Sequence, residues 1–246
     1  MRLEPAFALE AAALARAEAL ERAYADAAPQ DVLAGALAEF PGEIALVSSF
    51  GADSVVLLHM LAALDPTVPV LMIDTLMLFP ETLAYQRTVA DRLGLADVRR
   101  LRPERSDLAA LDPADDLHSR DADACCVIRK VAPLERVGGR WPVTITGRKR
   151  FQAPTRAALS HFEPHRGRIR VNPLAHWGAR EIAGYMDAHD LPRHPLVARG
   201  FRSIGCAPCT TPVASGEDDR AGRWRGSDKL ECGIHFGPDG RVLRAS

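Results

Sequence analysis

The residues with the clearest chemical potential in this sequence are its five cysteines. Two of them, Cys125 and Cys126, are adjacent in the stretch DACCVIRK. Cys206 and Cys209 form a C-x-x-C arrangement in GCAPCTTP, and Cys232 lies further on in KLECGIHF. Adjacent cysteines are poorly placed to bridge to each other, and an odd number leaves one without a partner. We therefore expect four cysteines that bind something together and one separate thiol.

The compartment in which the chain works decides what such cysteines can do. The N-terminal stretch carries acidic residues throughout, unlike a secretory leader, and no run in the chain approaches the ~20 apolar residues of a membrane span. These features predict a cytoplasmic protein with no membrane association. Because a reducing cytosol disfavours structural disulfides, metal binding or catalysis becomes the favoured role of the cysteines.

Composition excludes further classes of function. The chain has 246 residues, 47% of them hydrophobic, which is enough for one substantial globular core. Its 31 basic and 32 acidic residues give a formal net charge of −1, so the chain lacks the basic footprint of a nucleic-acid-binding protein. We therefore expect no nucleic-acid partner.

The two cysteine pairs favour an iron–sulfur cluster over zinc. Structural zinc usually takes four cysteines from two C-x-x-C knuckles, and the adjacent Cys125 and Cys126 suit that arrangement poorly. A [4Fe–4S] cluster presents four irons that lie farther apart, so consecutive cysteines can each reach a different iron. Cys125, Cys126, Cys206 and Cys209 are thus predicted to hold a [4Fe–4S] cluster, with a zinc site as the open alternative.

The remaining thiol, Cys232, is the candidate nucleophile. A free thiol has a pKa of about 8.5 and needs neighbouring cations to raise its thiolate fraction. Arg220, Arg223, Arg225 and Lys229 precede it in the same segment, although such a group of charges also suits a plain solvated surface. A thiol on a mobile segment can approach a pocket and leave it, as the carrier of a covalent intermediate must.

A possible anion site lies in SSFGADSVV, which reads as a strand, a turn and the start of a helix. Glycine lets the backbone approach a ligand, and N–H groups and hydroxyls at a helix start can cradle a phosphate. An ordinary turn capped by Asp53 or Ser54 is the alternative interpretation. The stretch resembles the PP-loop, S-x-G-x-D-S, with Phe50 at the usual second glycine, and its candidate residues are Ser48, Ser49, Phe50, Gly51, Asp53 and Ser54.

Alternating strands and helices position these motifs. Helical patterns cover about residues 8–27, 31–39, 53–64, 80–94 and 179–190, and strand patterns cover 43–50, 68–75, 97–103, 141–147 and 167–174. Such alternation predicts an α/β fold with a doubly wound, mostly parallel sheet. Glycine, proline and charged residues dominate after about residue 196, which indicates a loop-rich, mobile tail. We expect an N-terminal helical segment (1–40), a PP-loop nucleotide-binding α/β domain (41–200) and a C-terminal tail (201–246).

Several motifs occur together in the order of a known family. IDTLMLFPETLAYQ, TGRKRFQAPTRA and EDDRAGRWRGSDKLECGIH stand beside the PP-loop-like turn, the adjacent cysteines and the C-x-x-C. From about Ser48 to His235 the chain resembles the sulfonucleotide reductases, and its cysteine pairs resemble their iron–sulfur branch, the assimilatory adenylyl-sulfate reductases. The resemblance implies the PP-loop adenine-nucleotide-hydrolase-like fold and a role in sulfate assimilation.

The resemblance also implies a reaction and a set of site residues. Adenosine 5′-phosphosulfate would be reduced to sulfite and AMP through an S-sulfonate on Cys232, with thioredoxin or a similar dithiol protein as electron donor, and the protein would be a homo-oligomer by analogy. Further nucleotide and sulfate positions that it implies, beside those of the turn, are Asp74, Thr75, Lys130, Gly147, Arg148, Arg156, Arg220 and Arg223.

Three other functions remain open at this stage. A reductase of the 3′-phosphorylated nucleotide shares the loop and the tail cysteine but generally lacks the two cysteine pairs. A tRNA-thiolating PP-loop enzyme uses ATP and can also hold a cluster, although the balanced charge of this chain argues against RNA binding. A zinc-stabilised nucleotide sensor without catalysis would not need Cys232.

Overall fold

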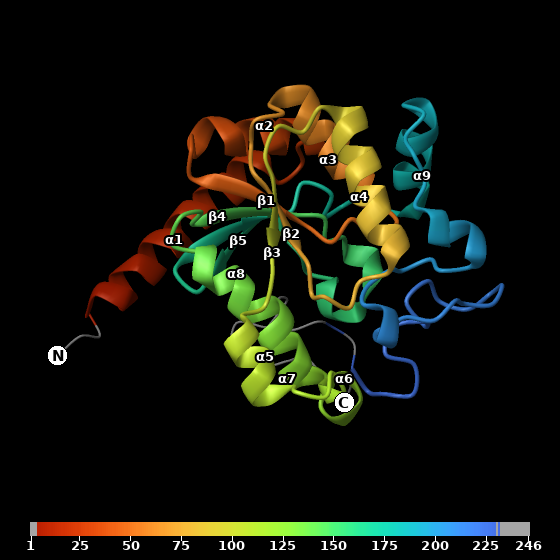
Figure 1. Cartoon of the computed structure of the whole chain (residues 1–246). Coiled ribbons are helices and arrows are strands. Elements are labelled where there is room, and N and C mark those ends of the chain that lie inside the picture. The colour runs from red at the N-terminus through yellow and green to blue at the C-terminus, as the bar shows by residue number, and fades with distance from the viewer. Residues whose placement is uncertain (1–3, 230, 232–246) are drawn as a thin grey trace.

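A single six-stranded sheet forms the centre of the molecule (Figure 1). The computed structural model describes residues 4–229 and residue 231, with side chains from residue 9 onward. The strand order is β3-β2-β1-β4-β6-β5, and every neighbouring pair is parallel except β5 with β6. The strands are β1 (Ile44–Ser48), β2 (Val70–Ile73), β3 (Val98–Leu101), β4 (Val143–Thr146), β5 (Phe162–His165) and β6 (Arg168–Val171).

Helices cover both faces of the sheet, as the alternating pattern predicts. Successive side chains of a strand point to opposite faces, so Leu46 packs in the large core and Ala45 packs with Leu71 and Trp141 on the other side. The helices are α1 (Glu4–Tyr24), α2 (Pro29–Glu39), α3 (Ser54–Leu64), α4 (Pro80–Leu93), α5 (Arg105–Leu111), α6 (Leu117–Arg120), α7 (Ala122–Cys126), α8 (Ala132–Val137) and α9 (Ala179–Ala188). Helices α2, α3 and α4 lie on one side of the sheet and α5, α7 and α8 on the other (Figure 1).

The strand order creates a crevice at one place in the sheet. The chain runs outward from β1 through β2 to β3, and then returns to add β4 on the opposite side of β1. Ligands of open α/β sheets bind outside the carboxyl ends of the strands at such a reversal. The predicted doubly wound fold is therefore confirmed, and the loops after β1 and β4 lie side by side.

Local signals in the sequence agree with the observed helix ends. Helix α4 starts at Pro80, which suits the first turn because proline has no N–H to leave unsatisfied. It ends at Gly94, which has φ 64° and closes the helix in the left-handed conformation. Both ends had been predicted at these residues.

The adjacent cysteines end α7 and lead into a π-helix, Val127–Val131. The Asp121 carboxylate accepts hydrogen bonds from the first N–H groups of α7, and this cap fixes where the helix starts. Arg129, inside the π-helix, is fully buried and binds Asp112 (2.6 Å) and the carbonyl of Thr75 (3.0 Å). This arginine ties the cysteine helix to the carboxyl end of β2.

The sequence patterns missed strand β5. Its residues, FEPH, show no apolar alternation, and proline removes a ladder donor. The strand forms because a tight turn at Arg166 (φ 51°) and Gly167 (φ 70°) folds it back on β6, and α1 packs against it. It lies at the edge of the sheet, where a proline is tolerated.

The segment after residue 196 is loop-rich, as predicted, with short 3-10 helices η4 (Pro195–Arg199) and η5 (Ala207–Cys209). Its described part nevertheless packs closely on the domain. Trp224 is buried, and its backbone N–H donates to the carbonyl of Cys209 at 3.1 Å. The tail boundary proposed at residue 200 stays a prediction. Among the described residues, no helix is long and apolar enough to cross a bilayer.

Candidate active site

A pocket of about 470 Å³ lies outside the carboxyl ends of β1 and β4. Segments that are far apart in the sequence form its wall: the loop after β1, the end of β2, the π-helix, the loop after β4 and the segment around residue 220. Twelve of the fourteen predicted nucleotide and sulfate residues line it, namely Ser48, Ser49, Gly51, Asp53, Ser54, Thr75, Lys130, Gly147, Arg148, Arg156, Arg220 and Arg223.

The other two predicted residues, Phe50 and Asp74, do not line the pocket in the described structure. Phe50 points into the core with no exposed surface, and its backbone takes φ 48°. Asp74 is buried and accepts hydrogen bonds from Arg102 Nε (2.9 Å) and the N–H of Leu76 (3.2 Å). That they contact a ligand stays a prediction; in the described structure both shape the loops that carry the lining residues.

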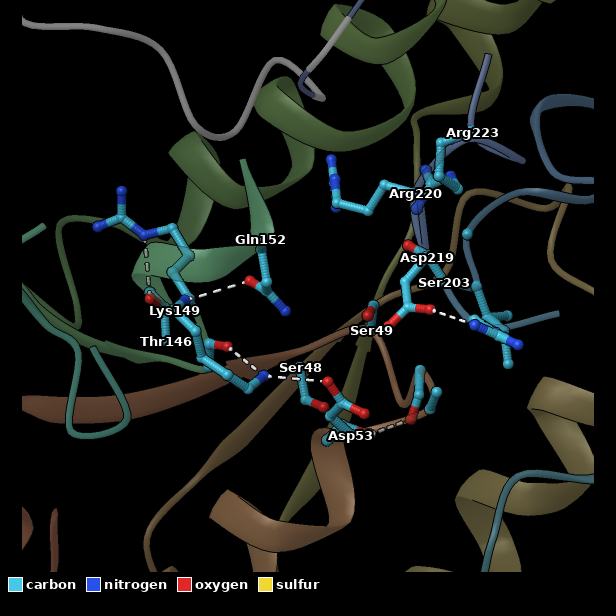
Figure 2. Close-up of a pocket in the computed structure, with 18 of the residues that line it drawn as sticks. Ser48, Ser49, Asp53, Thr146, Lys149, Gln152, Ser203, Asp219, Arg220 and Arg223 are labelled. Carbon is cyan, nitrogen blue, oxygen red and sulfur yellow. Dashed lines mark hydrogen bonds and ion pairs between the residues drawn. The ribbon is translucent and has the colours of Figure 1, made fainter. Parts of the chain in front are cut away.

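The loop after β1 is more than an ordinary capped turn. Asp53 stands at the N-cap of α3, but within the described residues its carboxylate makes no capping hydrogen bond. The Ser54 hydroxyl donates to the carbonyl of Gly51 (2.8 Å) and so does not cap the helix either. Ser48, Ser49 and Asp53 lie together on one side of the pocket (Figure 2), at a helix N-terminus that attracts anions.

Lys149 is a functional candidate that sequence reasoning missed. Its side chain is fully buried, yet it reaches the pocket, where Nζ lies 3.3 Å from Asp53 Oδ2 and donates to the carbonyl of Gly147 at 3.1 Å (Figure 2). Burial lowers the pKa of Lys149, and Asp53 acts in the opposite direction. Its place just after β4, at the strand reversal, was the signal that could have identified it.

Arg148, the neighbour of Lys149, lines the pocket but is anchored outside it. Its guanidinium pairs with Glu163 and donates to Asn172 Oδ1 (3.0 Å) and Thr146 Oγ1 (3.2 Å). Burial lowers the pKa of Arg148, and the Glu163 carboxylate opposes that shift. Arg148 therefore holds the loop after β4 in shape.

Three other arginines, Arg156, Arg220 and Arg223, also line the pocket. Arg156 and Arg220 both contact the carboxylate of Glu231, a buried residue that also lines the pocket. Arg223 stacks on Trp224, with its guanidinium carbon 4.5 Å from the ring centroid. Arg223 Nε is buried and has no hydrogen-bond partner among the described residues. A buried donor without a partner is costly, so this atom marks a place for an acceptor.

Lys130 connects the pocket to the cysteines. It lies one turn after Cys126, and its Nζ is 3.4 Å from the Sγ of that cysteine while the side chain lines the pocket. Lys130 therefore reaches both the pocket and the cysteine helix. The Thr75 hydroxyl makes a similar link, 3.2 Å from Cys206 Sγ.

The fold brings the two cysteine pairs together. Met77 packs against Cys125, and its carbonyl accepts from the N–H of Ala207 (2.8 Å), inside the C-x-x-C turn. Burial, followed by the adjacent Cys126, raises the pKa of Cys125 to about 12, and Cys206 and Cys209 act in the same direction. The four cysteines form no disulfide in the described structure, and their sulfurs are close enough to interact electrostatically.

This donor set fits a cluster better than a single ion. Within the described part of the chain, no three His, Cys, Asp or Glu side chains are placed to hold one metal ion. Thiolates that each bind a different iron need no common centre. Burial and the neighbouring thiols raise the pKa of Cys125 and of Cys209, so these two thiols need a positive centre before they can ionise, and bound iron would supply it.

The predicted nucleophile, Cys232, and His235 lie outside the described residues. Glu231, which directly precedes Cys232 in the sequence, is described and lines the pocket. The last described residue of the tail is therefore in the pocket wall.

Comparisons with known proteins agree with this site. Residues 43–212 match the family model described as phosphoadenosine phosphosulfate reductase domain. The chain is 51% identical to the adenosine 5′-phosphosulfate reductase of Mesorhizobium japonicum over 90% of its own length and 88% of the relative, and 39% identical to the phosphoadenosine 5′-phosphosulfate reductase of Gloeobacter violaceus over 94% and 97%.

The solved structures point the same way. The phosphoadenylyl-sulfate reductase of Candida auris superposes with a TM-score of 0.67 at 26% identity, covering 79% of this chain and 96% of the other. Yeast FAD synthetase, at 18% identity and a TM-score of 0.55 over 85% and 74%, shares the fold alone. Because the family model spans more than half of the chain and the relatives align over most of it, the chain belongs to the phosphoadenosine phosphosulfate reductase family.

Proposed function

We propose that this enzyme reduces adenosine 5′-phosphosulfate to sulfite and AMP during sulfate assimilation, with a dithiol protein such as thioredoxin as the electron donor. The observation that carries the proposal is the pocket: cations from three separate segments surround it, and its wall ends at Glu231, the residue before Cys232. Relatives named for this nucleotide share about half of their residues with the chain.

The pocket offers separate places for the two halves of the substrate. The loop after β1, the N-terminus of α3 and Lys149 suit the phosphate of AMP. Lys130 and Arg223 lie toward the cysteines and suit the sulfate, and Arg223 Nε supplies a donor that lacks an acceptor. A thiolate that approaches a dianion needs such compensating charge.

Cys232 would then act as the nucleophile. Its thiolate attacks the sulfur of the substrate, a bond forms between the two sulfur atoms, and the bond from sulfur to the phosphate oxygen breaks. The electron pair of that bond leaves with AMP, whose charge is spread over phosphate oxygens held by the loop. An S-sulfonate remains on Cys232.

The dithiol partner completes the reaction. One of its thiolates attacks Sγ of Cys232, and sulfite leaves with the electron pair of the bond between the two sulfurs. The second thiol of the partner resolves the mixed disulfide, which returns Cys232 as a thiolate and leaves the partner oxidised. The partner thus supplies both electrons. We place the enzyme in a reducing cytoplasm, which keeps the partner in its dithiol form.

The four other cysteines, Cys125, Cys126, Cys206 and Cys209, would hold a [4Fe–4S] cluster beside this pocket. When bound, the cluster supplies a structural and electrostatic centre rather than electrons for the reaction. Lys130 connects Cys126 to the pocket, because its Nζ contacts Cys126 Sγ and its side chain lines the pocket wall.

The proposal is tested by trapping the intermediate. Anaerobically purified protein is mixed with sulfur-labelled adenosine 5′-phosphosulfate without a reductant, and the labelled peptide is identified by mass spectrometry. We expect label on the peptide that contains Cys232 and its release as sulfite when thioredoxin is added. The Cys232→Ser variant should take up no label. Label on another residue, or sulfite formation by the variant, refutes the mechanism.

Nucleotide preference is tested in the same assay. The relative from Gloeobacter violaceus is named for the 3′-phosphorylated nucleotide, so that substrate is the second candidate. We expect higher kcat/KM with adenosine 5′-phosphosulfate, in keeping with the two cysteine pairs. Higher kcat/KM with the 3′-phosphorylated nucleotide would assign the enzyme to that reaction instead.

A further inference from the structure

The carboxylate of Glu231 occupies the cationic side of the pocket. Its Oε1 lies 2.6 Å from Arg156 Nε, its Oε2 lies 2.7 Å from Arg156 NH2, and Arg220 NH2 is 3.4 Å from the same Oε2. Only 2% of Glu231 and 7% of Arg156 are exposed to solvent. This is a two-pronged, charge-assisted pair in a buried setting, the strongest kind of side-chain contact with a carboxylate.

The pair conflicts with the binding of an anionic substrate. Arg156 and Arg220 are the cations that the resemblance assigns to the nucleotide and sulfate, and the Glu231 carboxylate already occupies Arg156 and offsets one of their two positive charges. A phosphosulfate dianion placed on the same guanidinium groups would lie next to a buried like charge, and such an arrangement is strongly unfavourable. Glu231 and the substrate therefore compete for these arginines.

The competition for Arg156 also concerns the proposed nucleophile, because Glu231 directly precedes Cys232 in the sequence. Glu231 is bonded to Cys232 in the sequence, so the pair with Arg156 anchors the residue next to the thiol. Arg156 is 75 positions earlier in the sequence, in the loop after β4. The pair of Glu231 with Arg156 thus links the loop after β4 directly to the residue before Cys232.

We propose that Glu231 is a built-in anion that occupies the anion subsite of the pocket when substrate is absent, and that the phosphosulfate group displaces it. Glu231 is then a positioning residue, because it holds its own position in the chain on the pocket wall before substrate binds. This inference rests on the proposed function for the identity of the anion. It also predicts the direction in which a substitution changes affinity.

The Glu231→Gln variant gives the decisive measurement. If Glu231 fills the anion subsite in most molecules, the apparent affinity for substrate falls in proportion to the fraction of molecules whose subsite is open. Removing the charge of Glu231 should therefore tighten substrate binding by about tenfold. If Glu231 instead stayed on Arg156 and helped to hold the substrate-bound site together, the same variant would bind substrate equally or more weakly. The sign of the change separates the two possibilities.

The same segment provides a matched control. Glu217 forms a two-pronged pair with Arg225, at 3.0 Å for both contacts, but it lies on the surface and outside the pocket lining. Glu217→Gln removes the same charge from the same type of pair. It should leave the affinity unchanged within twofold. Glu231→Asp keeps the charge and should retain an affinity closer to that of the unaltered protein.

Equilibrium binding is measured by calorimetry on full-length protein in the Cys232→Ser background, which prevents turnover. The ligands are adenosine 5′-phosphosulfate and, separately, inorganic pyrophosphate. We expect both to bind about tenfold more tightly to Glu231→Gln. Unchanged or weaker binding of both ligands, with circular dichroism showing a folded variant, would overturn the inference. Tighter pyrophosphate binding with no binding of the nucleotide by either protein would support the inference and refute the proposed function.

Turnover provides a second readout with active Cys232. Loss of the competitor should lower KM for adenosine 5′-phosphosulfate, while kcat should change little, because substrate has already displaced Glu231 from Arg156 in the bound state. A merely structural role would lower the melting temperature and leave KM unchanged, and that result would count against the proposal.

Discussion

The contact between Lys149 and Asp53 allows a quantitative test of the site. Replacing Lys149 with methionine keeps most of the side-chain volume and removes the charge, which leaves the Asp53 carboxylate without the cation that lies 3.3 Å away. Breaking a fully buried ion pair from one side costs about 3–5 kcal/mol. Because 35% of the Asp53 side chain is exposed, solvent offsets part of that cost, and we expect the free energy of unfolding to fall by about 2 kcal/mol.

A double-mutant cycle isolates this contribution. Lys149→Met should lower the free energy of unfolding by about 2 kcal/mol, which corresponds to roughly 4–8 °C in melting temperature for a chain of this size. Asp53→Asn leaves the buried lysine unpaired and should also destabilise the protein. The double variant carries no unpaired charge, so its loss should be smaller than the sum of the two by at least about 1 kcal/mol.

The assay combines urea unfolding, followed by circular dichroism, with calorimetric binding of AMP. Lys149→Met should weaken AMP binding about tenfold, because a cation is lost and Asp53 then repels the phosphate. The double variant should recover part of that affinity. Additive losses of stability in the cycle, or AMP binding that Lys149→Met leaves unchanged, would refute the reasoning.

Three other results are expected. Cys209→Ser should abolish the iron and sulfide content of anaerobically purified protein and its visible absorption; a colourless, zinc-containing native protein would contradict the cluster. Gly205→Ala should weaken substrate binding with little loss of stability, because a Cβ there lies 2.3 Å from the mobile end of Arg223, and unchanged KM would oppose this. Burial lowers the pKa of His194 from 6.5 to about 4, so its stabilising contribution, complete above pH 6.5, should be lost as the pH falls through about 4. Urea unfolding across that range should show a weaker pH dependence in His194→Gln, and an unchanged dependence would contradict the assignment.

Patterns that depend on neighbouring residues were predicted well. The apolar strands β1 and β2, the helix between Pro80 and Gly94, and the carboxyl-end loops all follow from short-range periodicity and turn chemistry. Strand β5 was missed because its sequence shows no alternation and its pairing depends on a turn and on packing against α1. Local propensity cannot show pairing that tertiary contacts impose.

Within the site, the sequence by itself determined which residue types were available: four thiols in two pairs, a phosphate-type loop and a series of arginines. The tertiary structure alone decided their partners. It turned Phe50 into the core, placed Lys149 on Asp53 and set Glu231 on Arg156. The physical reason is that electrostatic energy depends on distances of a few ångströms between residues that are 75 or more positions apart, and local sequence carries no record of those distances.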